Sequence, residues 1–460
     1  MERRISARWI VEGEEVREGA VLVIREGRIA GIEERGVGDE GEVEDLGEVA
    51  LIPGQINVHS HSFQRGLRGR TEYVEAGREE EDFWTWREGM YGLALGLSAE
   101  AVEAMARLAF WEMLRAGITH VGEFHYLHHG RDGEPYGDRL ELAKRIEKAA
   151  GDVGIRLTLL PVAYHTAGIG EAHREEQRRF VQGSVEEYLS DVRALREAMR
   201  GKKLVRVGMA PHSIRAVPRE WMEAIAAEAG ATGEVVHIHA CEQRREVAES
   251  VEAFGVPPIE ALHRWGVLEE GWTVIHGTHL SERELSILED VRPTVGACPT
   301  TERNLGDGFL PVVELMERGV PIALGSDSHT VIDPFCEMRL VEYHERLRRE
   351  ERNVLAHFGE SKTTAGALWP MGTVWGARSL GSDDGALRVG GPADFVAVDL
   401  RHPTLVGTSR QTLLTDIVLS MSCGAVQTVY VAGEARIEGG RHGLEEEIVE
   451  ESRRVLNEVW

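Results

Sequence analysis

The chain has 460 residues, of which 42% are hydrophobic, and this excludes a disordered segment or a small disulfide-stabilised protein. The net charge of −26, from 78 acidic and 52 basic residues, repels phosphate and argues against nucleic-acid and anionic-membrane partners. Four cysteines without a CxxC pair, no apolar run of about 18 residues and no signal-peptide pattern predict a cytoplasmic enzyme without a disulfide framework.

Both ends of the chain are predicted to form short β-strands. An apolar run at 20–24 is followed by RIAGIEE at 28–34, with glycines at the breaks. The later segments GPADFVAVDL and TVYVAGEARIEGG show the same pattern. We therefore expect residues 1–53 and 388–445 to pair into one small β-sandwich domain. Residues 446–460 have helical spacing and are expected to form a C-terminal helix on the surface.

The middle of the chain, residues 54–387, alternates short apolar strands with amphipathic helices. Strands are predicted at 55–61, 119–125, 155–164, 204–213, 234–241, 272–279, 292–301 and 321–328. Helical patterns cover 98–117, 218–230 and 311–319. Eight strand–helix units in about 330 residues are typical of a (β/α)8 TIM-type barrel, an α/β fold. The motifs GxGxxG and GxxxxGK[ST] are absent, which argues against a doubly wound nucleotide-binding sheet.

The first predicted strand ends in two histidines that can share a metal ion. In a barrel, the C-terminal ends of the strands form the catalytic face. His59 and His61 are two residues apart, so on a strand both side chains point to the same side. Two neutral imidazoles on one face can clamp a metal ion, although an HxH motif also arises by chance.

Three later strands end in further metal-binding or proton-transferring groups. Strand five ends in HIHACE, where His237 and His239 share a face and Glu242 follows. One of the pair could bind a metal while Glu242 carries protons from water to the leaving group. His276 ends strand six, and Asp327 near the end of strand eight could complete the metal shell and accept a proton. Each could be an ordinary polar strand end, but together they predict a metal-dependent catalytic site.

Two arginines are placed to recognise the substrate. Arg215 follows the fourth strand, and Arg87 lies in the long loop predicted after the first strand. Either could be a surface charge, the usual position of arginine. An arginine at the C-terminal end of a barrel strand can bind a carboxylate through two hydrogen bonds. This interpretation predicts an anionic substrate despite the acidic surface.

Several segments resemble one known family. They are NVHSHSFQRGLRG (57–69), FWTWREGMY (83–91), GEFHYLHH (122–129), APHSIRAV (210–217), HIHACEQ (237–243) and CPTTERNLGDG (298–308). They resemble the formimidoylglutamate deiminases of the amidohydrolase superfamily, over residues 1 to about 445. A small β-domain built from both chain ends also fits that superfamily. Two insertions, at 70–82 and around 165–182, interrupt the likeness.

The resemblance implies a role for most of the polar residues at the strand ends. It implies one zinc ion per chain, or another divalent metal, on His59, His61, His239 and Asp327. It assigns the proton transfers and the orientation of the attacking water to Glu242, His276 and Asp327. It implies that the glutamate portion of the substrate is held by Gln64, Arg87, Tyr126, His212 and Arg215. His237, His279 and His329 receive no catalytic role. A homodimer is also expected.

The implied reaction converts a small molecule, N-formimino-L-glutamate, to N-formyl-L-glutamate and ammonia, in histidine degradation. One alternative is a deaminase of a purine or other aminated ring, which needs stacking aromatic side chains rather than arginines. Trp84 and Trp86 could stack a ring, but we expect them to pack in the loop. A catalytically inactive barrel that serves as a binding protein is disfavoured by the intact metal ligands. The acidic cluster at 78–83 is expected to be a solvated loop.

Overall fold

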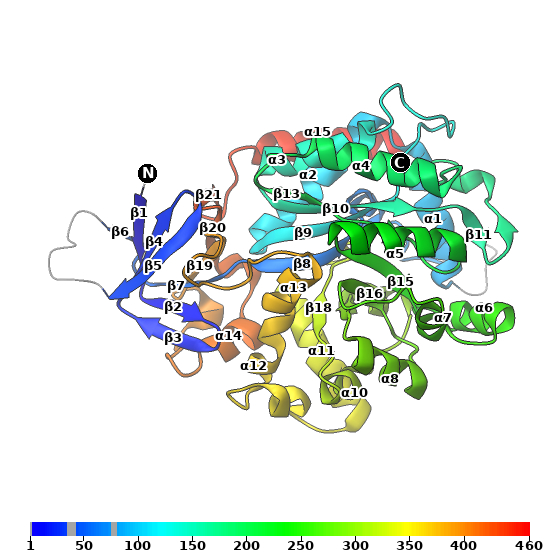
Figure 1. Cartoon of the computed structure of the whole chain (residues 1–460). Helices are drawn as coiled ribbons and strands as arrows, with labels where there is room; N and C mark the ends of the chain where they lie inside the picture. The colour runs from blue at the N-terminus through cyan, green and yellow to red at the C-terminus, as the bar shows by residue number, and fades with distance from the viewer. Residues whose placement is uncertain (1, 35–42, 75–80) are drawn as a thin grey trace.

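The computed structural model describes residues 2–34, 43–74 and 81–460. Figure 1 shows strands from both ends of the chain gathered on one side and a barrel surrounded by helices on the other. Half of the predicted acidic cluster at 78–83, residues 78–80, lies outside the described residues. Asp82 is described, and its carboxylate accepts hydrogen bonds from the amides of Trp84 and Thr85, so it caps a helix.

Parallel strands form the barrel in two sheets. One sheet has the order β13-β10-β9-β8 with β14 paired to β10, and the other has the order β15-β16-β17-β18. Their bounds are β8 Gln55–Ser60, β9 Ile118–His125, β10 Arg156–Ala163, β13 Val205–Val207, β14 Ala210–Pro211, β15 Val236–Ala240, β16 Trp272–His276, β17 Thr294–Ala297 and β18 Ile322–Leu324. Parallel bridges from Met209 to Val236 and from Ser60 to Asp327 join the sheets on both sides. The predicted TIM-type barrel is therefore confirmed.

Four predicted strands differ from the observed ones, and the strand predicted at 321–328 ends at Leu324. The strand predicted at 204–213 divides into β13 and β14. A Cβ on Gly208 would lie 2.9 Å from the carbonyl oxygen of Val235, so glycine permits the close approach at this break. The strand predicted at 292–301 ends earlier because Pro299 begins helix α9, where its missing N–H costs nothing. The strand predicted at 272–279 ends at His276.

Helices surround the barrel, and the three predicted ones are observed with small shifts at their ends. Helix α2 begins after Ser98, whose hydroxyl accepts a hydrogen bond from the amide of Ala101. The α-helices are α1 Phe83–Gly96, α2 Ala99–Arg115, α3 Glu141–Val153, α4 Val185–Ala198, α5 Arg219–Thr232, α6 Arg244–Phe254, α7 Pro258–Arg264, α8 Glu282–Val291, α9 Pro299–Leu305, α10 Val312–Glu317, α11 Pro334–Arg349, α12 Thr364–Leu368, α13 Val374–Ser379, α14 Leu413–Ser420 and α15 Glu445–Val459. Across the described ranges, none of these helices combines the length and apolar character that crossing a bilayer requires.

The two chain ends build two sheets beside the barrel (Figure 1). One has the order β5-β4-β1-β6, from Arg28–Glu34, Ala20–Arg25, Glu2–Ser6 and Glu44–Asp45. The other has the order β21-β20-β19-β7-β2-β3, from Glu434–Ile437, Val426–Val431, Phe395–Asp399, Val49–Pro53, Trp9–Glu12 and Glu15–Glu18. Leu22, Leu51 and Phe395 share one buried cluster that unites the two sheets. The exact domain boundaries stay a prediction.

Helix α15 packs on α2, as the apolar spacing near the C-terminus indicated. Ile448 and Val455 on α15 are buried. Arg107 on α2 donates hydrogen bonds to the carboxylates of Glu447 and Glu451, 2.7 Å away in each case. Because α2 also packs on barrel strand β9, α2 connects the C-terminal helix to the barrel.

Candidate active site

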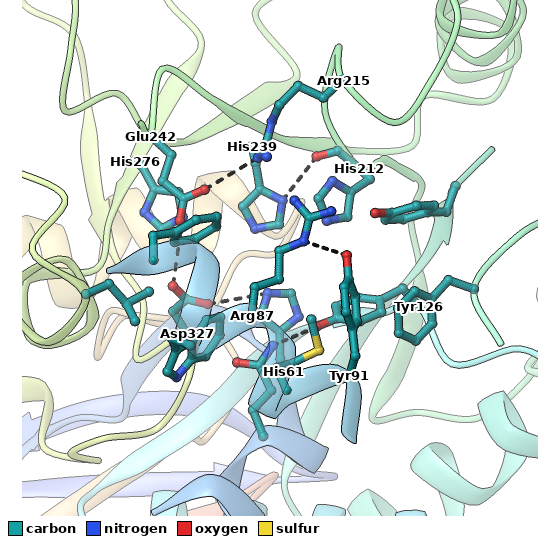
Figure 2. A pocket seen from close by; sticks show the side chains of 17 residues that line it. His61, Arg87, Tyr91, Tyr126, His212, Arg215, His239, Glu242, His276 and Asp327 are labelled. Carbon is teal, nitrogen blue, oxygen red and sulfur yellow. Dashed lines mark hydrogen bonds and ion pairs between the residues drawn. The ribbon is translucent and has the colours of Figure 1, made fainter. Parts of the chain in front are cut away.

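Four side chains from three barrel strands converge at one point on the C-terminal face. The Nε2 atoms of His59 and His239 are 3.0 Å apart. One oxygen of Asp327 lies 3.5 Å from Nε2 of His59 and 3.3 Å from Nε2 of His61. Figure 2 shows His61, His239 and Asp327 facing one another across the pocket. The structure thus brings together the four residues predicted as metal ligands.

Hydrogen bonds to the Nδ1 atoms of His61 and His239 leave lone pairs on the Nε2 atoms that converge. Nδ1 of His61 bonds the carbonyl oxygen of Phe124 at 2.9 Å, and Nδ1 of His239 bonds that of His212 at 3.1 Å. Each Nδ1 therefore carries the proton, and each Nε2 is an acceptor. Burial lowers the pKa of all three imidazoles, so they are neutral. Together with Nε2 of His59 and the carboxylate of Asp327, these two Nε2 atoms form a donor set that suits a divalent cation such as zinc.

The backbone is strained where the site residues leave their strands. His276 has a φ of 74° and Asp327 a φ of 49°, in the left-handed region that non-glycine residues rarely adopt. Such conformations persist where the surrounding structure imposes them, and they concentrate at functional sites. Gly325 allows the close approach of β18 to β8, because a Cβ there would lie 2.8 Å from Cβ of His59. This approach places Asp327 beside the histidines.

Glu242 and His276 form a buried pair next to the histidine–aspartate cluster. Nε2 of His276 lies 3.6 Å from Glu242 and 3.8 Å from Asp327. Burial raises the pKa of Glu242 to about 7, against the opposing effects of His276 and Arg215. Burial by itself lowers the pKa of His276, but Glu242, Glu302 and Asp327 together raise it to about 10. The pair can therefore hold and pass a proton near neutral pH.

Glu123 is a buried carboxylate to which the sequence analysis gave no role. It lies on β9, and its oxygens accept hydrogen bonds from the hydroxyl of Ser60 and from the amide and hydroxyl of Ser62. These two serines flank His61, so Glu123 holds the backbone that positions this histidine. A glutamate inside a strand predicted to be part of the buried barrel was the available signal, because an unpaired buried carboxylate is costly.

We expect the stability of the protein to fall as Glu123 ionises. Burial raises the pKa of Glu123 from 4.5 to about 7, so between these values the native state holds a proton that the unfolded chain has released. The contribution of this proton to the free energy of unfolding is fully present below pH 4.5. It is lost as the pH rises through 7, and the total loss is about 3 kcal/mol. The thermal midpoint of the wild type minus that of Glu123→Gln should decrease as the pH rises from about 5 to about 8. Parallel pH profiles of the two proteins would contradict this.

A cavity opens beside the histidine cluster. Its walls include every residue predicted to hold the substrate, namely Gln64, Arg87, Tyr126, His212 and Arg215. Gln64 lies on the short helix η1 (Ser62–Leu67) and donates a 2.6 Å hydrogen bond to the Tyr126 hydroxyl. Arg87 was predicted in a loop but lies on helix α1, since Asp82 caps that helix five residues earlier.

Two features of the arginines differ from the expectation. Arg215 is buried and lies 3.7 Å from the carboxylate of Glu242 and 3.6 Å from that of Glu246. It therefore lies against Glu242 and also lines the cavity. The guanidinium of Arg87 lies 5.3 Å from the ring of Trp84, within cation–π range, whereas apolar packing was expected for this tryptophan.

The three unassigned histidines are separated from the cluster in different ways. His237 bonds the carbonyl oxygen of Ser379 at 2.9 Å, so its role is structural. His329 is buried and bonds the hydroxyls of Ser326 and Ser60. His279 is partly exposed.

Comparisons with known proteins agree with this architecture. A model of the amidohydrolase family matches residues 50–436. A formimidoylglutamate deiminase from Pseudomonas aeruginosa is 38% identical over 413 residues, 89% of each chain. A 5-methylthioadenosine/S-adenosylhomocysteine deaminase from Haloarcula marismortui is 28% identical, over 91% of this chain and 88% of the relative. A solved amidohydrolase from Brucella melitensis is 35% identical, with a TM-score of 0.92 over 99% of both chains. An adenosine deaminase from Xanthomonas campestris, solved with zinc, shares the fold at 23% identity, with a TM-score of 0.81 over 99% of this chain and 98% of that chain.

The barrel, the site and these relatives define a hydrolase that acts on carbon–nitrogen bonds. The chain belongs to the amidohydrolase family, and its resemblance to the formimidoylglutamate deiminases extends over most of its length.

Proposed function

We propose that this protein is a zinc-dependent deiminase that hydrolyses N-formimino-L-glutamate to N-formyl-L-glutamate and ammonia. The observation that carries this proposal is that two arginines, Arg87 and Arg215, line the same cavity as the histidine–aspartate cluster. Two guanidinium groups suit a substrate with two carboxylates. The 38% identity to a formimidoylglutamate deiminase supports the same substrate. A role in histidine degradation and a homodimeric assembly belong to this proposal by resemblance alone.

His59, His61, His239 and Asp327 would hold the metal ion. A divalent metal in such a site supplies Lewis acidity, which lowers the pKa of a water molecule toward about 7. Asp327 accepts a proton from the water that attacks the formimino carbon. Glu242 passes a proton to the terminal nitrogen, with His276 beside it to stabilise its charge. The carbon–nitrogen bond to this nitrogen then breaks, and ammonia leaves while the N-formyl group stays on glutamate.

The arginines determine which nitrogen leaves. With the two carboxylates held by Arg87 and Arg215, the glutamate nitrogen is fixed, and the terminal nitrogen is directed to Glu242. Arg215 lies 3.7 Å from Glu242, so substrate binding and the proton-transfer group are adjacent.

A deaminase of an aminated ring is the second candidate. Relatives that act on 5-methylthioadenosine and S-adenosylhomocysteine share 28% identity with the chain, and Phe83, Trp86 and Tyr164 line the cavity, where a ring could stack. The guanidinium groups of Arg87 and Arg215 favour the dicarboxylate, because a neutral purine has no anionic group for the two arginines that line the cavity.

The test is ammonia release by purified zinc-loaded protein from N-formimino-L-glutamate and from 5-methylthioadenosine. We expect release from the first only. In Arg87→Met, KM for the formimino substrate should rise about tenfold to a hundredfold with little change in kcat, because a charged hydrogen bond to the substrate is lost.

Arg245→Met provides the matched control. Arg245 also lies over Trp84, with its guanidinium 4.3 Å from the ring, but it lines an outer groove rather than the cavity. This variant should keep the wild-type KM. Ammonia release from 5-methylthioadenosine but not from N-formimino-L-glutamate would contradict the proposed substrate. It would remain consistent with the proposed metal site.

A further inference from the structure

A buried amide fixes two tyrosines in the wall of the cavity. Gln177 ends the short helix η2 (Glu175–Gln177), within one of the segments that interrupt the family likeness, and it has no exposed surface. Its Oε1 accepts a hydrogen bond from the backbone amide of Arg174 at 2.8 Å. Its Nε2 donates to the hydroxyl of Tyr91 at 3.1 Å and to that of Tyr164 at 2.8 Å. Because a backbone amide can only donate, the orientation of the Gln177 amide is determined.

Both tyrosine oxygens are therefore acceptors in these contacts. The hydroxyl of Tyr91 accepts a second hydrogen bond, at 2.5 Å, from Nε of Arg87, which can only donate (Figure 2). Each phenol still carries its own proton. The two hydroxyls can share one hydrogen bond between them, and this uses only one of the two protons. At least one phenolic proton remains available to an acceptor in the cavity.

A substrate group that accepts hydrogen bonds beside Tyr91 and Tyr164 would be close to several hydrogen-bond donors. Tyr91 and Tyr164 line the cavity together with Arg87 and Arg215. Burial raises the pKa of Tyr164, so its phenol keeps the proton and stays a donor. A carboxylate accepts about four hydrogen bonds, more than one guanidinium group supplies through a single edge.

We propose that Tyr91 and Tyr164 are a further substrate-binding pair, of which at least one hydroxyl donates to a substrate carboxylate held by Arg87, and that Gln177 is the positioning residue that turns them toward it. This inference rests on the proposed function, because it requires a carboxylate substrate. It assigns to the inserted segment around Gln177 a part in selecting acidic substrates.

The test uses Tyr91→Phe and Tyr164→Phe, which remove only a hydroxyl. We expect at least one of them to lower kcat/KM for N-formimino-L-glutamate about tenfold to a hundredfold, chiefly through KM, because a hydrogen bond to a charged group is lost. Inhibition by the stable product and two analogues of it would locate the contact. N-formyl-L-glutamate has both carboxylates, N-formyl-4-aminobutyrate lacks the α-carboxylate, and N-formyl-L-norvaline lacks the side-chain carboxylate.

The affected variant should bind the dicarboxylate and one monocarboxylate more weakly than the wild type does. Its affinity for the other monocarboxylate should be unchanged, because the contacted group is absent there. Equal losses for all three compounds would show a structural role and overturn the inference, as would unchanged kcat/KM in both variants. Tyr188→Phe is the matched control, since its buried hydroxyl donates to the Pro161 carbonyl instead of lining the cavity. If the wild type releases no ammonia from N-formimino-L-glutamate, the proposed function itself fails, which is a distinct result.

Discussion

Replacing Glu242 by glutamine is expected to lower kcat for ammonia release by about 10²–10⁴-fold and to leave KM nearly unchanged. The side chain is 6% exposed and lies 3.6 Å from His276, where burial raises its pKa to about 7. A group with this pKa gives and takes a proton at neutral pH with little free-energy cost. Glutamine keeps the shape and the contacts but cannot exchange a proton.

The measurement is steady-state kinetics of the zinc-loaded variant, with Glu249→Gln as the control. Glu249 lies close by on helix α6, but it pairs with Arg245 at the outer groove and is partly exposed. Near-normal turnover in Glu242→Gln would remove this residue from the proton-transfer step. A comparable loss in Glu249→Gln would indicate a general effect of charge instead.

Replacing His239 by alanine is expected to abolish metal binding. We expect kcat to fall about a thousandfold or more as a result, because water without a metal keeps a pKa near 15.7. His239 contributes a neutral Nε2 that lies 3.0 Å from Nε2 of His59. Elemental analysis should find about one zinc per chain in the wild type and far less in the variant. Zinc should also raise the thermal midpoint of the metal-free wild type but not that of the variant.

His237→Gln is the matched control for this experiment. His237 precedes His239 by two residues on β15 but bonds the carbonyl oxygen of Ser379, away from the cluster. Its replacement should leave the zinc content unchanged. Full zinc content in His239→Ala would contradict the assigned ligands, and so would loss of zinc in His237→Gln alone.

The order of elements was predictable because local patterns determine it. Alternating apolar strands and amphipathic helices predicted the barrel, and all its strands are found close to their expected positions. The strand ends at 297 and 276 were missed because proline placement and backbone strain ended them early. The helical position of Arg87 was missed because the capping role of Asp82 is a short-range signal inside a segment that reads as a charged loop.

The convergence of the proposed metal ligands was also predictable from local patterns. His59 and His61 share a strand face, and the barrel brings the ends of all its strands to one side, so ligands distant in sequence meet there. Glu123 was not predictable in its role, because its partners Ser60 and Ser62 lie about sixty residues earlier in the chain. The same holds for Gln177, which reaches back to Tyr91.

The sequence by itself determined the barrel, the paired chain ends and the identity of the groups at the strand ends, because hydrophobic periodicity and strand alternation are local properties. Only the tertiary structure decided how those groups act on one another. Arg215 lies against Glu242 and Glu246, and the phenols of Tyr91 and Tyr164 are oriented by Gln177. Hydrogen bonds and ion pairs depend on distances of a few ångströms between residues far apart in the chain, and folding alone sets those distances.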